Sequence, residues 1–121
     1  PVTLWGSGSP KREFLHVNDL AEAVSFAFNH QLNGDLYNIG SGSDISIKEL
    51  ALLVQKVVGH EGDIVWDKSK PDGTPRKLLD VSKIHEAGWH HRIQLKEGLA
   101  KTYEWFLQNI DRLKMRSLQA N

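Results

Sequence analysis

Residues 63–77 read DIVWDKSKPDGTPRK, an apolar segment that runs directly into a loop of turn-forming and charged residues. The apolar part, Asp63–Trp66, has the length and composition of a short β-strand. In the loop that follows, two prolines fix φ and Gly73 permits backbone conformations closed to other residues, so the path is stiff and neither helix nor strand is expected there. Loops at the carboxyl ends of strands often hold ligands in α/β folds, so this loop is a candidate ligand site if the chain has an α/β fold.

The charges in this loop have an uneven distribution. One carboxylate, Asp72, lies among four cations, which are Lys68, Lys70, Arg76 and Lys77. This distribution suits a diphosphate with a ribose hydroxyl beside it, because cationic side chains bind phosphate oxygens and a carboxylate accepts hydroxyl hydrogens. The alternative is a solvated surface loop whose charges only keep it in water. The loop alone does not decide between the two.

The composition limits the classes of protein to consider. The chain has 121 residues, 40% of them hydrophobic and 25% charged, which predicts one folded domain. The net charge is zero, which argues against general binding to nucleic acid or a membrane surface, and the lack of cysteine excludes disulfides and thiolate chemistry. No apolar run approaches the ~18 residues of a membrane span, and we expect a cytoplasmic protein. Because Pro1 leads directly into a strand, we also expect a longer parent protein.

The rest of the chain alternates strand-like and helix-like segments. Strands are predicted at Val2–Trp5 and at residues 36–39, with an extended segment at residues 13–17. The first helix is predicted to begin at an Asn18 N-cap, to line one face with Leu20, Val24, Ala27 and Phe28, and to end before Asn33. This alternation predicts a small sheet covered by helices.

Three further helices are expected after residue 40. Ser46 and Glu49 form a capping-box pattern at the start of one, and Gly59 ends it. Asp80 is predicted to cap a short helix that ends at Gly88. A longer helix carries an apolar stripe from Leu95 to Ile110, and the tail beyond Lys114 is expected to fray.

Two side chains outside the loop are candidates for ligand contacts. Arg12 follows the turn at residues 6–10, where its guanidinium could meet phosphate oxygens; its alternative role is an ion pair with Glu13 or Asp19. Trp5 precedes the same turn and could flank a nucleobase, whereas its alternative role is in the core.

Other site types find little support. Residues 6–8 and 40–42 both read Gly-Ser-Gly, but neither continues into a dinucleotide-binding fingerprint, and we interpret both as turns. The chain has no P-loop, zinc-protease or nucleophile-elbow motif. His85, His90 and His91 lack further ligands and are expected at the surface rather than on a metal. His16 could meet a substrate, although a hydrogen-bonded structural role is favoured.

Several segments taken together identify a family resemblance. Residues 2–17 (VTLWGSGSPKREFLHV), 37–42 (YNIGSG) and 69–80 (SKPDGTPRKLLD), with Gly88-Trp89 and residues 102–107 (TYEWFL), closely resemble the C-terminal part of GDP-L-fucose synthases. These belong to the extended short-chain dehydrogenase/reductase group. The resemblance covers nearly the whole chain, and the segment at 69–80 is its most specific part.

The resemblance implies a function and a site. Enzymes of this family convert GDP-4-dehydro-6-deoxy-D-mannose to GDP-L-fucose by epimerisation at C3 and C5 and reduction with NADPH, and their C-terminal lobe binds the substrate. By position, Trp5, Arg12, Asp72 and Lys77 match the family's GDP-sugar contacts, with Arg12 and Lys77 near the diphosphate and Asp72 near the ribose. The charge pattern alone does not choose Lys77 over Arg76.

The resemblance also implies what this chain lacks. The N-terminal Rossmann half, which carries the cofactor loop, the catalytic Tyr-x-x-x-Lys pair and the helices of the family's homodimer, has no counterpart in these 121 residues. We therefore expect a substrate-binding lobe with no catalytic, cofactor-binding or metal-binding residue of its own, inactive alone and with exposed apolar surface. The alternatives are a lobe of another NAD(P)-dependent nucleotide-sugar epimerase, reductase or dehydratase, and a stand-alone nucleotide-sugar binding module.

Overall fold

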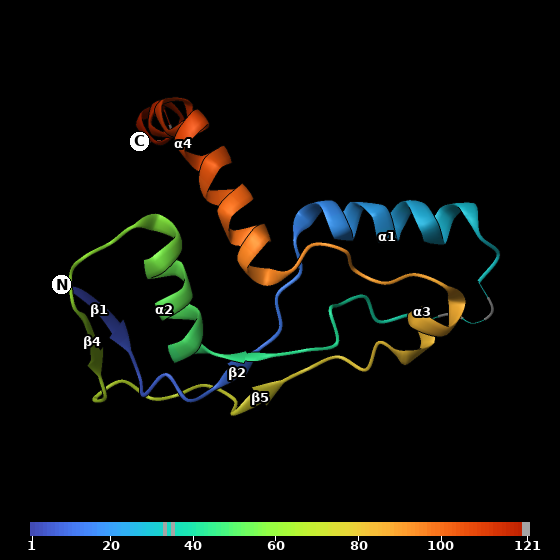
Figure 1. Ribbon diagram of the computed structural model, residues 1–121, viewed down its shortest axis with the longest axis horizontal. Coiled ribbons are helices and arrows are strands. Elements are labelled where there is room, and N and C mark those ends of the chain that lie inside the picture. Colours follow the sequence, from blue (N-terminus) through green and yellow to red (C-terminus); the bar gives the residue numbers. More distant parts are fainter. Residues whose placement is uncertain (33, 35, 120–121) are drawn as a thin grey trace.

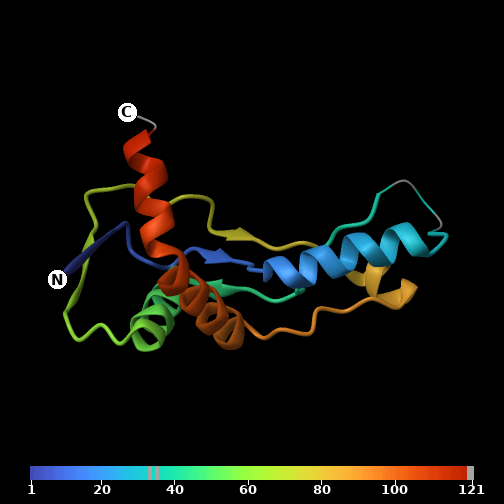
Figure 2. The ribbon, with the colours of Figure 1, turned by 90° about the horizontal axis from the view of Figure 1, so that it is seen from above.

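The computed structural model describes residues 1–32, 34 and 36–119 and has an elongated shape with two ends (Figure 1). One end holds a two-stranded parallel sheet of β1 (Val2–Trp5) and β4 (Ile64–Asp67), in register from Val2 opposite Ile64 to Trp5 opposite Asp67. The other end holds α1 (Val17–Asn29) and α3 (Ser82–Ala87), and a three-stranded sheet connects the two ends (Figures 1 and 2). The strand predicted at residues 63–66 is confirmed with a shift of one residue.

The connecting sheet has the order β3-β2-β5. In it β2 (Lys11–Arg12) pairs antiparallel with β3 (Ile45–Ser46) and parallel with β5 (Arg76–Lys77). The expectation of a loop without strand over residues 69–77 was therefore wrong for its last two residues. Both follow the second proline of the loop and keep their backbone N–H groups, so they can pair with the free edge of β2.

Helix α1 (Val17–Asn29) begins two residues earlier than the predicted Asn18 cap allows. The N-cap is His16, whose Nδ1 accepts the backbone N–H of Asn18 at 3.1 Å. Asn18 as the cap was therefore wrong, and so was an extended segment reaching Val17. A ring nitrogen at the N-cap satisfies one of the unpaired N–H groups of the first turn, as a Ser or Asn side chain would. The hydrogen-bonded role predicted for His16 is confirmed, although from a cap and not a strand.

Helix α2 (Ile47–Val58) has both predicted end signals. The Ser46 hydroxyl accepts the Glu49 N–H at 3.1 Å, and the Glu49 carboxylate accepts the Ser46 N–H at 3.1 Å. Gly59 ends the helix with φ of 70°, a conformation that favours glycine. The capping box and the stop are confirmed.

Replacing Ser46 with alanine is expected to lower the free energy of unfolding by about 1 kcal/mol, because the first turn of α2 loses its side-chain cap. Urea denaturation followed by circular dichroism measures this loss. Lys48→Ala is the matched control, since Lys48 is exposed in the same turn and contributes no cap. An unchanged denaturation midpoint in the Ser46 variant would contradict the expectation.

The last two helices are α3 (Ser82–Ala87) and α4 (Leu95–Gln119). Asp80 accepts the Ser82 N–H at 3.0 Å and hydroxyl at 2.7 Å, but the N-cap position belongs to Val81, so the predicted Asp80 cap is displaced by one residue. Gly88 ends α3 with φ of 109°, as predicted. Helix α4 continues past Lys114, so the frayed tail was wrong. The helical residues past Lys114 read MRSLQ, and Met, Arg, Leu and Gln all favour helix.

The buried core is small and lies where α1 meets α3. Its members are Ala23, Val81, Ile84 and Trp89, with the partly buried Leu15, Phe26, Leu32, Tyr37 and Ile39 packed against them. Residues 36–39 form no strand, contrary to prediction. A side chain supplies one of the hydrogen bonds that a neighbouring strand would have made: Lys83 Nζ donates to the Leu36 carbonyl oxygen at 2.9 Å. Tyr37 and Ile39 pack on the core from this irregular segment.

Many large apolar side chains are exposed in the described part of the chain. The clearest case is a stripe along the outer side of α1, formed by Val17, Leu20, Val24 and Phe28, with Phe28 90% exposed. The helix buries its opposite side, where Ala23 is fully buried, so the predicted apolar face of α1 faces away from the core. None of the helices in the described part of the chain is both long and apolar enough to cross a membrane.

Candidate functional site

The charged loop is held against the turn at residues 6–10. Asp72 accepts the Ser7 backbone N–H on Oδ1 at 2.8 Å and the Ser7 hydroxyl on Oδ2 at 2.6 Å. Both hydrogen bonds lower the pKa of Asp72, and the bond from the Ser7 hydroxyl has the larger effect. Gly6 has φ of 84°, and a Cβ there would collide with Asp72 Oδ1, so the turn requires glycine beside the carboxylate. The structure thus places Asp72 beside the strand end that carries Trp5.

Arg12 reaches the same loop from β2. Its Nη1 donates to the carbonyl oxygens of Lys11 at 2.7 Å and Thr74 at 2.6 Å. Glu13 and Asp19, its alternative partners, bind backbone N–H groups instead. The guanidinium is therefore fixed by neutral carbonyl groups and keeps its charge for an anion.

Trp5 lies at the end of β1 and is 73% exposed, so its alternative role in the core is wrong. Lys70 Nζ lies 5.3 Å from the centroid of its ring, within cation–π range. An exposed indole with a cation from the loop beside it is a surface on which a planar base can stack.

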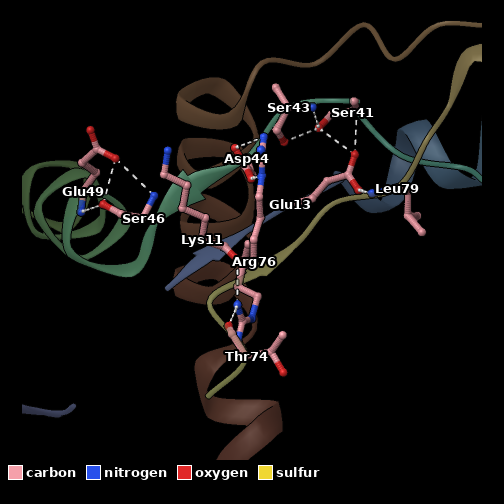
Figure 3. A network of polar contacts seen from close by, with 12 residues as sticks. Lys11, Glu13, Ser41, Ser43, Asp44, Ser46, Glu49, Thr74, Arg76 and Leu79 are labelled. Atoms are coloured by element: carbon pink, nitrogen blue, oxygen red, sulfur yellow. Dashed lines mark hydrogen bonds and ion pairs between the residues drawn. The ribbon is translucent and has the colours of Figure 1, made fainter. Parts of the chain in front are cut away.

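Arg76 and Lys77 have different partners. Arg76 Nε lies 2.6 Å from Asp44 Oδ2 in an ion pair drawn in Figure 3. Lys77 is the register partner of Arg12 in the parallel pairing of β2 with β5, so their side chains leave the sheet on the same face. Within the described part of the chain, the Lys77 side chain has no hydrogen bond or ion pair. The structure thus leaves Lys77 free beside Arg12 and commits Arg76 elsewhere.

Sequence reasoning missed the role of Glu13. Its Oε2 accepts the Gly42 N–H at 2.6 Å and the Ser41 hydroxyl at 3.4 Å, while its Oε1 accepts the Leu79 N–H at 3.1 Å (Figure 3). One carboxylate thereby joins the turn at residues 40–42 to the segment after β5. A possible signal was its place next to Arg12, between glycine-rich turns with unpaired N–H groups.

The structural role of Asp19 was also missed, since the sequence indicated this residue as a partner for Arg12. Asp19 is 2% exposed, and its carboxylate accepts the backbone N–H groups of Arg92 at 3.1 Å and Ile93 at 3.0 Å. These bonds attach the start of α1 to the segment that leads into α4. Both missed carboxylates fix the frame around the site.

The histidine group has no geometry for a metal. The rings of His85 and His90 stack with centroids 4.0 Å apart, and burial, followed by the charges of His90 and His91, lowers the pKa of His85. No set of three metal-ligating side chains could hold an ion among the residues that the structure describes.

The two Gly-Ser-Gly segments do not fit a dinucleotide cofactor. The first leads into β2 and is bound to Asp72, and the second precedes β3 and is bound to Glu13. In a cofactor loop, the glycine turn opens a helix whose first N–H groups face the pyrophosphate. Both segments are turns, as the sequence predicts.

The chain resembles known proteins over nearly all its length. Residues 1–40 match the NAD dependent epimerase/dehydratase family. "Probable GDP-L-fucose synthase 1" of Oryza sativa subsp. japonica is 59% identical over 90% of this chain and 33% of its own length. The GDP-L-fucose synthase of Escherichia coli (strain K12) is 51% identical over 93% of this chain and 38% of its own length. The chain thus spans about a third of the curated relatives it matches.

Solved structures agree with this result. A GDP-6-OMe-4-keto-L-xylo-heptose reductase from C. jejuni superposes with a TM-score of 0.82 at 41% identity, over 88% of this chain and 34% of that one. A UDP-glucose 4-epimerase from Thermotoga maritima, solved with UDP-glucose, gives a TM-score of 0.80 at 26% identity, over 90% of this chain and 35% of that one. Another similar structure, a GDP-mannoheptose C4 reductase from Campylobacter jejuni, has NADP bound. The fold is therefore that of part of an epimerase or reductase of this type.

Proposed function

The chain is a homologue of the GDP-L-fucose synthases, and we propose on this premise that it forms the C-terminal, substrate-binding part of such an enzyme. The parent enzyme would convert GDP-4-dehydro-6-deoxy-D-mannose to GDP-L-fucose by 3,5-epimerisation and reduction with NADPH. The observation that carries the proposal is the set of contacts that connect the loop to the first turn and to β2: Asp72 is bound by Ser7, Arg12 donates to the Thr74 carbonyl oxygen, and Lys77 lies opposite Arg12.

The diphosphate subsite is proposed at Arg12 and Lys77. The two residues are register partners on one face of the β3-β2-β5 sheet, and the Arg12 guanidinium is already oriented by the Thr74 carbonyl group. A planar guanidinium and a free ammonium beside each other neutralise two phosphates without reorganisation of the backbone. Because Arg76 is committed to Asp44, it is not part of this subsite.

The nucleoside subsite is proposed at Asp72 and Trp5. Asp72 is exposed and ionised, and each carboxylate oxygen keeps a lone pair for a ribose hydroxyl beyond its bond to Ser7. Trp5 offers an exposed ring for the base. Both lie at the carboxyl-end side of the β1–β4 sheet, where ligands bind in many α/β folds.

We assign the chemical steps to a part of the parent enzyme outside this chain. Neither Tyr37 nor Tyr103 has a lysine four residues later, so a Tyr-x-x-x-Lys proton donor does not occur in these residues. The exposed stripe on α1 is consistent with packing against that part, which would hold NADPH and the homodimer contacts. The chain by itself is therefore proposed to bind substrate without turning it over.

Calorimetric titration of the chain with GDP, UDP and ADP tests the proposal. GDP is expected to bind at least about tenfold more tightly than ADP, since a sugar-nucleotide site must discriminate its base. UDP is included because the fold is shared with a UDP-glucose 4-epimerase. Preference for UDP would favour another nucleotide-sugar enzyme, and equal affinity for all three would reduce the site to a general phosphate site.

A further inference from the structure

Two side-chain anchors hold the middle of the charged loop among the described residues: Arg12 Nη1 donates to the Thr74 carbonyl oxygen at 2.6 Å, and Asp72 is bound by Ser7. Its start is fixed by the Asp67 carbonyl oxygen, which accepts the N–H groups of Gly6 at 2.9 Å and Lys70 at 3.2 Å. Its end is fixed where Lys11 N–H donates to the Pro75 carbonyl oxygen at 2.9 Å. Between these points Asp72 is bound only through Ser7.

Ser7 uses every hydrogen-bonding group that faces the loop. Its backbone N–H and its hydroxyl donate to the two different oxygens of Asp72, which fixes the plane of the carboxylate. Because an ionised carboxylate only accepts, the Ser7 hydroxyl must be the donor to it. The Ser7 oxygen is then an acceptor toward Ser9, whose N–H lies at 3.2 Å and whose hydroxyl lies at 2.8 Å. The chain of bonds therefore runs in one direction, from Ser9 through Ser7 to Asp72.

From this geometry we infer that Ser7 is the positioning residue of the proposed nucleotide site, because it orients Asp72 and holds the middle of the loop beside Trp5. The inference rests on the proposed function. Ser7 does not need to touch the ligand for this role. Without the Ser7 hydroxyl, Asp72 keeps only its bond to the backbone N–H, so the plane of the carboxylate is no longer fixed and the group proposed for the ribose loses its orientation.

The role also predicts a change in titration. Donation from Ser7 stabilises the ionised form of Asp72, so its folded-state pKa is lowered, and the bond is lost as pH falls through that lowered value. Removing the hydroxyl takes away the larger of the two donations and moves the pKa of Asp72 up toward its ordinary value, while the backbone donation remains.

Titration of GDP against the chain and three variants tests the inference. Ser7→Ala is expected to weaken GDP binding about five- to tenfold, as loss of a hydrogen bond to a charged group does when water competes. Ser7→Thr keeps the hydroxyl and is expected to remain within about twofold of wild type. Ser9→Ala is the matched control from the same turn. It leaves both bonds between Ser7 and Asp72 in place, so its GDP affinity is also expected to remain within about twofold of wild type.

Carboxyl-carbon NMR of Asp72 without ligand separates this inference from the proposed function. A raised Asp72 pKa in Ser7→Ala, restored in Ser7→Thr, together with the loss of GDP affinity, supports the role of Ser7. An unchanged Asp72 titration in Ser7→Ala overturns it, and so does unchanged GDP affinity despite a shifted titration. If the wild-type chain binds no nucleotide, the proposed function fails, and the Asp72 titration alone then decides whether Ser7 positions the carboxylate.

Discussion

Replacing Arg12 and Lys77 together with alanine is expected to weaken GDP binding by about 100-fold or more. Each side chain is proposed to make a charge-assisted bond to the diphosphate, and such bonds contribute about 1.5–3 kcal/mol each. The two lie side by side on β2 and β5, so in a single variant the remaining cation can compensate for the missing one. The double variant removes both cations and excludes this compensation. Calorimetric titration at constant ionic strength measures the loss, since salt screens phosphate contacts.

The neighbouring cation provides the matched control. Arg76→Ala removes the same type of charge from the same strand, but its guanidinium is paired with Asp44, so GDP affinity is expected to stay within about twofold. Circular dichroism of each variant verifies the fold, because Arg12 also bonds the Thr74 carbonyl oxygen. Equal losses in Arg76→Ala and in the double variant would mean that only total charge matters and would contradict the proposed subsite.

Asp19→Ala is expected to lower the free energy of unfolding by about 3 kcal/mol. The carboxylate is buried and accepts two backbone N–H groups, and its removal leaves both donors without a partner, at a cost of about 1–3 kcal/mol each. Urea denaturation measures the change. In a protein with so small a core, a loss of this size removes a large part of the total stability.

Two comparisons define what Asp19 contributes. Asp19→Asn keeps one carbonyl acceptor, and a smaller loss is expected than in the alanine variant. Glu22→Ala removes an exposed partner of Arg92 at 3.2 Å, and less than about 1 kcal/mol is expected. A loss in Asp19→Ala no greater than that in Glu22→Ala would refute the role of the buried carboxylate.

The parts of the fold that the sequence predicted well depend on neighbouring residues. The capping box of α2 joins residues three apart, and Gly59 and Gly88 end their helices through their own backbone conformations. The strands β1 and β4 are short apolar runs bounded by turns. Wrong assignments at residues 36–39 and 76–77 concern pairing, which depends on segments far away in the chain. Residues 36–39 resemble a strand but have no neighbouring strand to pair with in the described part of the chain, so they stay irregular. Residues 76–77 follow Pro75 and form a strand because the edge of β2 lies beside them.

In the candidate site, too, the features that depend on neighbouring residues were predicted, and those that depend on distant contacts were not. Charge and turn chemistry indicated Arg12, Asp72 and the cations of the loop, and the resemblance selected Lys77. Only the three-dimensional contacts explain why Arg76 differs from Lys77, since Asp44 lies 32 residues away in sequence. Glu13 and Asp19 were missed for the same reason: their partners are backbone N–H groups, which have no signature in a sequence.

The bonds of Glu13 have a consequence for the order in which the protein assembles. This carboxylate joins segments 29 and 66 residues away, and β2 meets β5 across a similar separation. Contacts between such distant segments close large loops before they gain energy, so they form slowly compared with the local helices α1 and α2. During synthesis from the N-terminus, this junction can close only after residue 79 has left the ribosome, and we expect it to be among the last parts of the chain to acquire protection from hydrogen exchange.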